Sequence, residues 1–294
     1  MPDEPVMIEE TDAAFPSPRL RGEGGGSRMR GGRKCIGSSM TAPTIAILIQ
    51  PGPNPEIVVN ALKAAFPSLV VIEEQPESKK LFIRRRAKKL GWVQALGQLA
   101  TMVVSKYGKR FTTKRAQEII EEFGVNPSPD SQIRRIAVPS ANSPELLEAL
   151  GKIRPAALLL VSCRMMKAQT LTAIPCPVLN FHAGINPQYR GLQGGYWARI
   201  ARNEENFGAT VHLVDPGVDT GDVLYQQRVK PSKRDTMHTY PLLQTAASTG
   251  IIVEAMRDAA AGNLKPLKIA APSRQWYHPP IWTWLWNGVT RGIW

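Results

Sequence analysis

Cysteine is scarce in this chain of 294 residues, which contains only Cys35, Cys163 and Cys176. Their number is odd and none of their spacings is that of paired metal ligands, so the pattern favours neither a disulfide framework nor a cysteine metal centre. Only four histidines are present, without a recognised ligand spacing, and we expect no bound metal. So little cysteine is typical of a protein in a reducing cytoplasm.

Long apolar runs are also missing. No stretch approaches the roughly 20 apolar residues that cross a bilayer. Residues 1–12 carry five acidic side chains and are not followed by the apolar core of a signal peptide. We therefore expect a cytoplasmic protein whose main body is not an integral membrane protein.

Glycine loops that bind nucleotide phosphates are a third absence. After the first expected strand, the turn at residues 50–55 reads Gln-Pro-Gly-Pro-Asn-Pro, and proline lacks the N–H group that a pyrophosphate site uses. No Gly-Lys-Ser/Thr phosphate loop occurs either. The sequence therefore predicts that a ligand is bound by other loops, those after Ser162, Phe181 and Asp215.

Apolar strands alternate with helical segments from residue 44 onward. The apolar pattern predicts strands at 44–50, 69–72, 133–138, 156–162 and 177–181, and alternation of polar and apolar residues predicts paired strands at 207–215 and 223–229. Helical spacing predicts helices at 56–66, 78–123 (broken by a turn), from 143 onward, at 167–173 and at 237–261. Continuous apolar strands separated by helices indicate a Rossmann-like α/β fold, with a mostly parallel sheet and helices on both faces.

This pattern divides the chain into three parts. Residues 1–40 are rich in Gly, Arg and Pro without apolar periodicity, and we expect a disordered extension, with Met40 as an alternative start. Residues 41–262 are expected to form the catalytic domain, with a helical insertion at about 78–123. Residues 263–294 form a tail with five of the seven tryptophans. The tail is expected to pack over the domain, form a homodimer contact or lie on a membrane surface.

Positive charge is unevenly distributed. The formal net charge is +13, and seven basic residues lie between Lys79 and Lys89. Such a cluster is either a solvated helix face or a site for an anionic ligand, a polyanion or a membrane surface. Aromatic residues are not interleaved with these cations as in a base-stacking surface, and we expect no nucleic-acid partner.

The strand at 177–181 leads into the most informative motif, Asn180-Phe-His-Ala-Gly-Ile-Asn-Pro-Gln-Tyr-Arg-Gly191. On an extended backbone, residues i and i+2 point to the same face, so Asn180 and His182 should converge at the carboxyl end of the strand. Open α/β sheets bind ligands at that edge. A Gly-rich loop at 214–222 places Asp219 where it could reach the same point. An amide donor, an imidazole and a carboxylate together suit acyl transfer.

These motifs resemble those of the folate-dependent formyltransferase family, which includes glycinamide ribonucleotide, methionyl-tRNA and amino-sugar N-formyltransferases. The shared motifs are Asn-X-His, here Asn180 to His182; Pro-X-Tyr/Trp-Arg-Gly, here Pro187 to Gly191; and Val-Asp-X-X-X-Asp-Thr-Gly, here Val214 to Gly221. Three motifs in the same order and spacing are far more specific than any one of them.

The resemblance implies a role for each catalytic residue. Asn180 would donate an N–H to the oxyanion that forms when an amine attacks the formyl carbon, worth about a hundred- to thousandfold in rate. His182 would transfer the proton, worth about a hundred- to ten-thousandfold. Asp219 would orient the His182 ring and favour its charged form. No metal is needed.

The resemblance also implies binding residues for two substrates. The co-substrate 10-formyltetrahydrofolate would be bound by Arg164, Met165, Met166, Asp215 and Val218. The acceptor would be bound by Tyr189, Arg190, Gly191 and Gln193. The chain departs from relatives that read His-Pro-Ser-Leu, since it has Ala183 and Gly184 after His182.

Three functions stay open at this point. The sequence lacks the added domains expected of a methionyl-tRNA formyltransferase or a formyltetrahydrofolate hydrolase, so we expect transfer to a small primary amine that is phosphorylated or linked to a nucleotide, with an amino sugar favoured. A hydrolase would pass the formyl group to water instead. A non-catalytic module would use the pocket to bind folate or a nucleotide.

Overall fold

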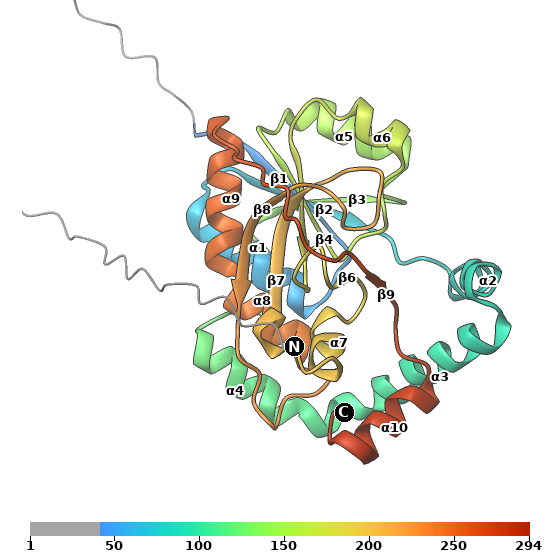
Figure 1. Ribbon diagram of the computed structural model, residues 1–294. Helices are drawn as coiled ribbons and strands as arrows, with labels where there is room; N and C mark the ends of the chain where they lie inside the picture. The colour runs from blue at the N-terminus through green and yellow to red at the C-terminus, as the bar shows by residue number, and fades with distance from the viewer. Residues whose placement is uncertain (1–41) are drawn as a thin grey trace, which may run out of the picture. The chain divides into compact units, whose positions relative to one another are not determined.

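A seven-stranded sheet organises the computed structural model, which describes residues 42–294 apart from the side chains of residues 79–82 and 109 (Figure 1). In spatial order the strands are β3 (Arg134–Val138), β2 (Leu69–Glu74), β1 (Ile45–Ile49), β4 (Leu158–Val161), β5 (Val178–His182), β7 (Gly208–Leu213) and β8 (Val223–Arg228). The first five are parallel, and β7 and β8 extend the sheet in antiparallel fashion. The predicted mostly parallel Rossmann-like fold is confirmed.

The helices connect and cover these strands. They are α1 (Pro53–Ala65), α2 (Lys79–Leu90), α3 (Trp92–Gly108), α4 (Thr113–Phe123), α5 (Pro144–Ile153), α6 (Ala168–Ala173), α7 (Gly194–Ile200), α8 (Tyr240–Ala247), α9 (Thr249–Ala261) and α10 (Ile281–Arg291), with 3₁₀ turns η1 (Lys109–Thr112) and η2 (Glu204–Asn206). The predicted helical insertion is confirmed, and Gly91 breaks it with a φ of 83° that favours glycine.

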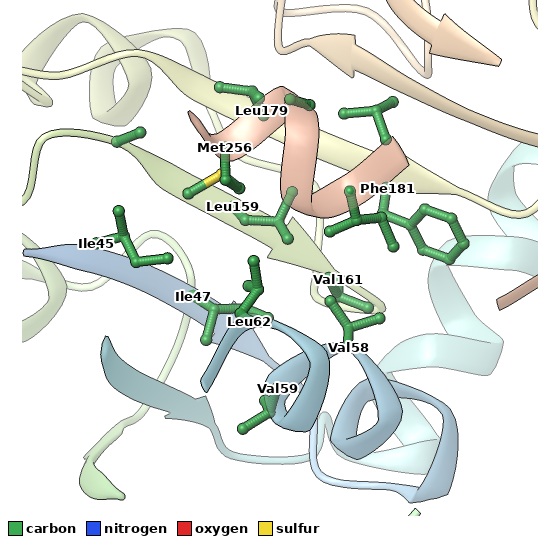
Figure 2. Packing of buried hydrophobic residues seen from close by; sticks show 14 of the residues in the cluster. Ile45, Ile47, Val58, Val59, Leu62, Leu159, Val161, Leu179, Phe181 and Met256 are labelled. Atoms are coloured by element: carbon green, nitrogen blue, oxygen red, sulfur yellow. The ribbon is translucent and has the colours of Figure 1, made fainter. Parts of the chain in front are cut away.

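Both faces of the central strand β1 are buried, which explains why it is apolar at every position. Ile45 and Ile47 of β1 pack with Val58 and Leu62 of α1 and with Met256 of α9, as Figure 2 shows. The intervening residues of β1, Ala46 and Leu48, enter a second cluster beneath α5. Alternate side chains of a strand point to opposite faces, so a strand covered on both sides must be apolar at every position.

A third apolar cluster ties the tail to the domain. Trp284 and Ile293 of the tail pack with Tyr196, Tyr240 and other buried side chains from α4, α7 and α8. The Asn287 amide also donates to the Tyr196 hydroxyl at 3.0 Å. Residues 42–294 belong to one compact unit. The tail packs over the domain through these contacts, which is one of the arrangements that the sequence predicts.

Two predicted helices have different bounds in the structure. The helix predicted at 237–261 is two helices, because the chain leaves helical geometry at Ser248 (φ −108°, ψ 4°). This break lets α8 pack in the third cluster while α9 covers the sheet. The helix predicted from Glu56 begins at Pro53, within the predicted turn, because the first helical turn needs no N–H from proline. The extension predicted at 1–40 lies outside the described residues.

The topology points β1, β4 and β5 toward one edge of the sheet, where β5 ends at His182. A separate two-stranded sheet pairs β6 (Arg190–Gly191) with β9 (Gln275–Trp276), so the tail also borders the motif that follows β5. Among the described residues, no helix combines the length and hydropathy needed to cross a membrane.

Candidate active site

Asn180 and His182 lie at the end of β5, as predicted. The antiparallel pairing of β5 with β7 places Asn180 directly opposite His212 and His182 opposite Thr210. The His212 Nδ1 lies 2.7 Å from the Leu213 carbonyl oxygen, which requires a proton on that nitrogen. In the neutral ring, Nε2 is then an acceptor, and it receives the Asn180 amide N–H at 3.1 Å.

Asp219 connects these side chains. One carboxylate oxygen, Oδ1, accepts the Asn180 amide at 3.1 Å and lies 3.4 Å from His212 Nε2. The other, Oδ2, accepts the Gly191 backbone N–H at 2.9 Å and lies 3.5 Å from His182 Nδ1. The three predicted residues therefore meet at one point. Asp219 contacts the other two, and its side chain is only 15% exposed.

The surroundings of Asp219 keep it ionised. Burial alone would raise its pKa, but nearby His182, nearby His212 and the Gly191 N–H together hold the pKa of Asp219 well below its usual range. A permanent negative charge at this point orients both imidazoles and the Asn180 amide. Within residues 42–294, no group of three or more His, Cys, Asp or Glu side chains is arranged to hold a metal ion.

The His182 ring is fixed from two sides. Its Nε2–H donates to the Tyr189 carbonyl oxygen at 2.8 Å, and the ring is 7% exposed. Nδ1 is the nitrogen that is not committed to a carbonyl, and it faces Asp219. Nδ1 is therefore the ring nitrogen that lies next to the negative charge of Asp219.

The loop after β5 folds back onto Asp219 through backbone contacts. Arg190 donates from Nη1 to the Val218 carbonyl at 2.7 Å, and Asn186 donates from its amide to the Asp219 carbonyl at 3.1 Å. Gly191 has a φ of 94°, and a Cβ at this position would collide with the Trp276 backbone. Glycine is therefore required at 191 for its N–H to reach the carboxylate.

The residues predicted to bind the pterin have varied surroundings. The guanidinium of Arg164 bonds to Glu74 at 2.7 Å and to the carbonyls of Gln75 and Pro139. Met166 is 3% exposed within the core, whereas Met165 is 60% exposed. These contacts give Arg164 and Met166 structural roles, and pterin binding by them stays a prediction.

The other predicted donor residues lie in the loop that carries Asp219. Asp215 fixes a turn by accepting from the Gly217 N–H at 3.1 Å and the Thr220 hydroxyl at 2.6 Å. The Val218 carbonyl accepts from Arg190. Both residues thus shape the loop, and their contact with folate stays a prediction.

The predicted acceptor residues surround the β6–β9 pair. Tyr189 is 4% exposed and stacks on Trp276, with ring centroids 6.1 Å apart. Gln193 begins α7, and its side-chain oxygen is buried without a hydrogen-bond partner among the described residues, as is that of Gln188. These two buried side-chain oxygens therefore have a capacity to accept hydrogen bonds that the described residues leave unused.

His212 is a member of the site that the sequence did not reveal. It lies 32 residues after Asn180, in the strand predicted at 207–215. None of the three sequence motifs includes this histidine. The register of β5 against β7 brings it to Asn180. Strand pairing of 177–181 with 207–215 was the signal that could have found it.

Comparison with known proteins agrees with this geometry. A family model described as formyl transferase matches residues 42–255, and the chain belongs to this family. The methionyl-tRNA formyltransferase of Anaeromyxobacter dehalogenans is 35% identical over 124 residues, which cover 42% of this chain and 39% of that protein. The methionyl-tRNA formyltransferase of Clostridium novyi is 27% identical over 55% of this chain and 50% of its own length. The chain thus matches half or less of the length of these relatives.

Solved structures share the fold. A sugar N-formyltransferase from a Shewanella species has a TM-score of 0.51 at 12% identity, covering 79% of this chain and 76% of its own. A phosphoribosylglycinamide formyltransferase from Anaplasma phagocytophilum has a TM-score of 0.50 at 16% identity, covering 76% and 88%. At such identities the likeness concerns the fold.

Proposed function

We propose that this protein transfers a formyl group from 10-formyltetrahydrofolate to the primary amine of a small acceptor. The observation that carries the proposal is the contact of Asp219 with Asn180, His182 and the Gly191 N–H in a chain of the formyl transferase family. These groups supply an amide donor and a base held next to a fixed negative charge. Acyl transfer to an amine requires both.

The reaction needs an oxyanion donor and a proton acceptor. The amine nitrogen attacks the formyl carbon, a C–N bond forms, and the carbonyl oxygen becomes an oxyanion. In the structure, the Asn180 amide nitrogen bonds to His212 and Asp219, so one of these bonds must be exchanged for the oxyanion. His182 Nδ1 takes the proton from the amine, the bond to N10 of the folate breaks, and a proton passes to that nitrogen.

The acceptor that we propose is an amino sugar carrying a phosphate or a nucleotide. The buried oxygens of Gln188 and Gln193 accept hydrogen bonds from an amine or from sugar hydroxyls. Arg274 lies 3.9 Å over the Trp276 ring and is exposed beside the β6–β9 pair, where its charge favours a phosphate. The stacked rings of Tyr189, Trp276 and Trp197 lie at the same β6–β9 pair and form the aromatic part of the proposed acceptor site.

The test is formyl transfer from 10-formyltetrahydrofolate to a panel of nucleotide-linked amino sugars, with product identified by mass spectrometry. We expect one acceptor to gain a formyl group and Asn180→Ala to lower kcat by about a hundred- to thousandfold. Asn263→Ala is the matched control, because Asn263 is exposed at the end of α9. Release of formate without any formylated amine would instead establish a hydrolase. Unchanged biological activity of Asn180→Ala would establish a non-catalytic binding module.

A further inference from the structure

Helices α3 and α10 together expose a continuous set of large apolar side chains, which we call the α3–α10 face. Phe111 and Val289 are each 78% exposed, Val93 is 72% and Trp286 is 67% exposed. The face consists of Trp92, Val93, Leu96, Val103, Val104, Tyr107 and Phe111 from α3 and η1, and Trp282, Leu285, Trp286 and Val289 from α10. Soluble proteins rarely leave such a contiguous apolar surface uncovered unless it binds something.

Helical spacing gathers these side chains on one side. On α10 the large apolar side chains that are exposed stand at positions 282, 285, 286 and 289, which form a single stripe, while Trp284 and Asn287 are buried. Leu285, Trp286 and Val289 of this stripe are exposed, whereas the half-buried Trp282 also packs on α3. Exposed apolar residues in such a stripe differ from the single ones that any surface carries.

The two helices are held side by side. The ring of Trp282 lies against Gly97 of α3, and the Thr101 hydroxyl donates to the Pro279 carbonyl at 2.8 Å, just before α10. Figure 1 shows α10 alongside α3, with α2 at the N-terminal end of α3. The apolar stripes are therefore presented on a rigid two-helix platform.

Positive charge predominates around this platform, where Glu77 pairs with Arg85 at 2.7 Å. Residues 78–117 contain twelve basic residues and no acidic one, a formal charge of +12 in a chain whose total is +13. Residues 259–294 contain four basic residues and again no acidic one. The exposed cations of these segments include Arg84, Arg85, Lys88, Lys89, Lys106, Arg110 and Arg291.

We propose that the α3–α10 face docks this protein onto the surface of an anionic lipid bilayer. Tryptophan and aliphatic side chains on one side of a helix insert to about 5–10 Å, at the boundary of headgroups and acyl chains. Basic residues near an anionic membrane surface each add about 1 kcal/mol of attraction. The face therefore combines the two contributions that hold a peripheral protein on a membrane.

Two other occupants fit the observations less well. A second copy of this chain would place Lys106, Arg110 and Arg291 against the same cations of its partner, with no acidic residue in these segments to neutralise them. A nucleic acid would satisfy the charge and could stack its bases on the aromatic rings of the face, but it would leave the aliphatic side chains of the face without an apolar partner. Val93, Leu96, Leu285 and Val289 offer aliphatic surface, which suits acyl chains.

The experiment is co-sedimentation of the full chain with vesicles of phosphatidylcholine alone or with roughly a third phosphatidylglycerol. We expect binding to the anionic vesicles, weakening with salt, and a blue shift of tryptophan emission on binding. Val289→Glu, on the apolar stripe, and the pair Arg84→Glu with Lys88→Glu should each weaken binding by roughly tenfold or more. The pair Lys152→Glu with Arg257→Glu makes the same charge change on α5 and α9, and should weaken it less.

Three results would overturn the proposal. The first is that the native protein fails to sediment with anionic vesicles, and the second is that Val289→Glu sediments as well as the native protein does. The third is a dimer, measured by light scattering, that Val289→Glu dissociates while no vesicle binding occurs, since a second copy would then cover the face. Retained circular dichroism of each variant separates these results from unfolding. Vesicle binding requires no formyl transfer, so this test is independent of the proposed reaction.

Discussion

Asn180 and His212 face each other across the antiparallel pair β5 and β7, with the amide nitrogen 3.1 Å from the imidazole Nε2. The same imidazole nitrogen lies 3.4 Å from Asp219 Oδ1. His212 therefore holds the side chain proposed to donate to the oxyanion and contacts the carboxylate that orients His182. We infer that it positions these groups without itself touching the reacting atoms.

Replacement of His212 should lower turnover with little effect on folate binding. In His212→Leu the Asn180 amide loses one of its two acceptors, and we expect kcat to fall by roughly tenfold or more while KM stays near its native value. His212→Gln keeps a polar partner and should retain more activity. The pH profile of kcat should change shape in both variants, because an imidazole that contacts Asp219 is gone. Equal activity of His212→Leu and the native protein would contradict the inference.

Asp219→Asn removes a charge with almost no change of shape. The neutral amide of Asn cannot stabilise a protonated His182. In one of the two orientations of this amide, its NH₂ group also faces the Gly191 N–H, which is a donor as well. We expect kcat to fall about a hundredfold or more. Asp130→Asn is the matched control outside the site, since Asp130 fixes a turn by accepting the Gln132 N–H at 2.8 Å. The assignment is wrong if both variants lose activity equally, measured as formylated product per unit of folded protein.

The strand and helix pattern was readable from the sequence because it depends on local periodicity. The strands of a sheet that is buried on both faces are uninterrupted apolar runs, as Ile45 to Ile49 illustrate. The meeting of Asn180, His182 and Asp219 was also readable, since the first two share a strand face. The sequence did not predict the break at Ser248, because the apolar residues of α8 and α9 follow one uninterrupted helical spacing. The two helices differ only in the apolar cluster into which each one packs.

Contacts between distant segments were the part that no local pattern could predict. His212 reaches Asn180 through strand register, and Arg164 reaches Glu74 over 90 residues of sequence. No sequence pattern placed α10 beside α3, and no helix was predicted at 281–291. Such pairings depend on tertiary packing, and a single sequence carries no direct signal for them.

Arg164 provides a test that separates a structural role from folate binding. Its guanidinium neutralises Glu74, whose side chain is 1% exposed. Arg164→Met leaves that buried carboxylate without a counter-ion and with only the backbone N–H groups of Ala141 and Arg164 as donors, so we expect a loss of about 3–5 kcal/mol in the free energy of unfolding, measured by urea denaturation. Arg257→Met, which breaks an exposed pair with Glu254, should cost at most about 1 kcal/mol. Native stability with a raised KM for the folate would instead support the predicted pterin contact.

His278 should make stability depend on pH. Burial, and then the positive charge of Arg86, lower its pKa from 6.5 to about 4. Between these values the unfolded chain binds more protons than the folded one, so stability falls as the pH drops through this window. We expect a loss of about 1–2 kcal/mol between pH 7 and pH 5, measured by urea denaturation. His278→Gln should flatten this dependence, and an unchanged slope would contradict the assignment.

Gly97 tests how α10 is held against α3. A Cβ at this position would collide with the Trp282 ring and with the Pro280 ring, so Gly97→Ala should push α10 away from its packing site. We expect a loss of about 1–3 kcal/mol in the free energy of unfolding and a change in tryptophan fluorescence. Gly151 lies in α5, and a Cβ there meets no atom within 4 Å. Gly151→Ala is therefore the matched control, and alanine's better helix propensity should stabilise it by about 0.5–1 kcal/mol. If both substitutions stabilise the protein, then Trp282 does not pack on Gly97 and the platform formed by the two helices is looser than its contacts indicate.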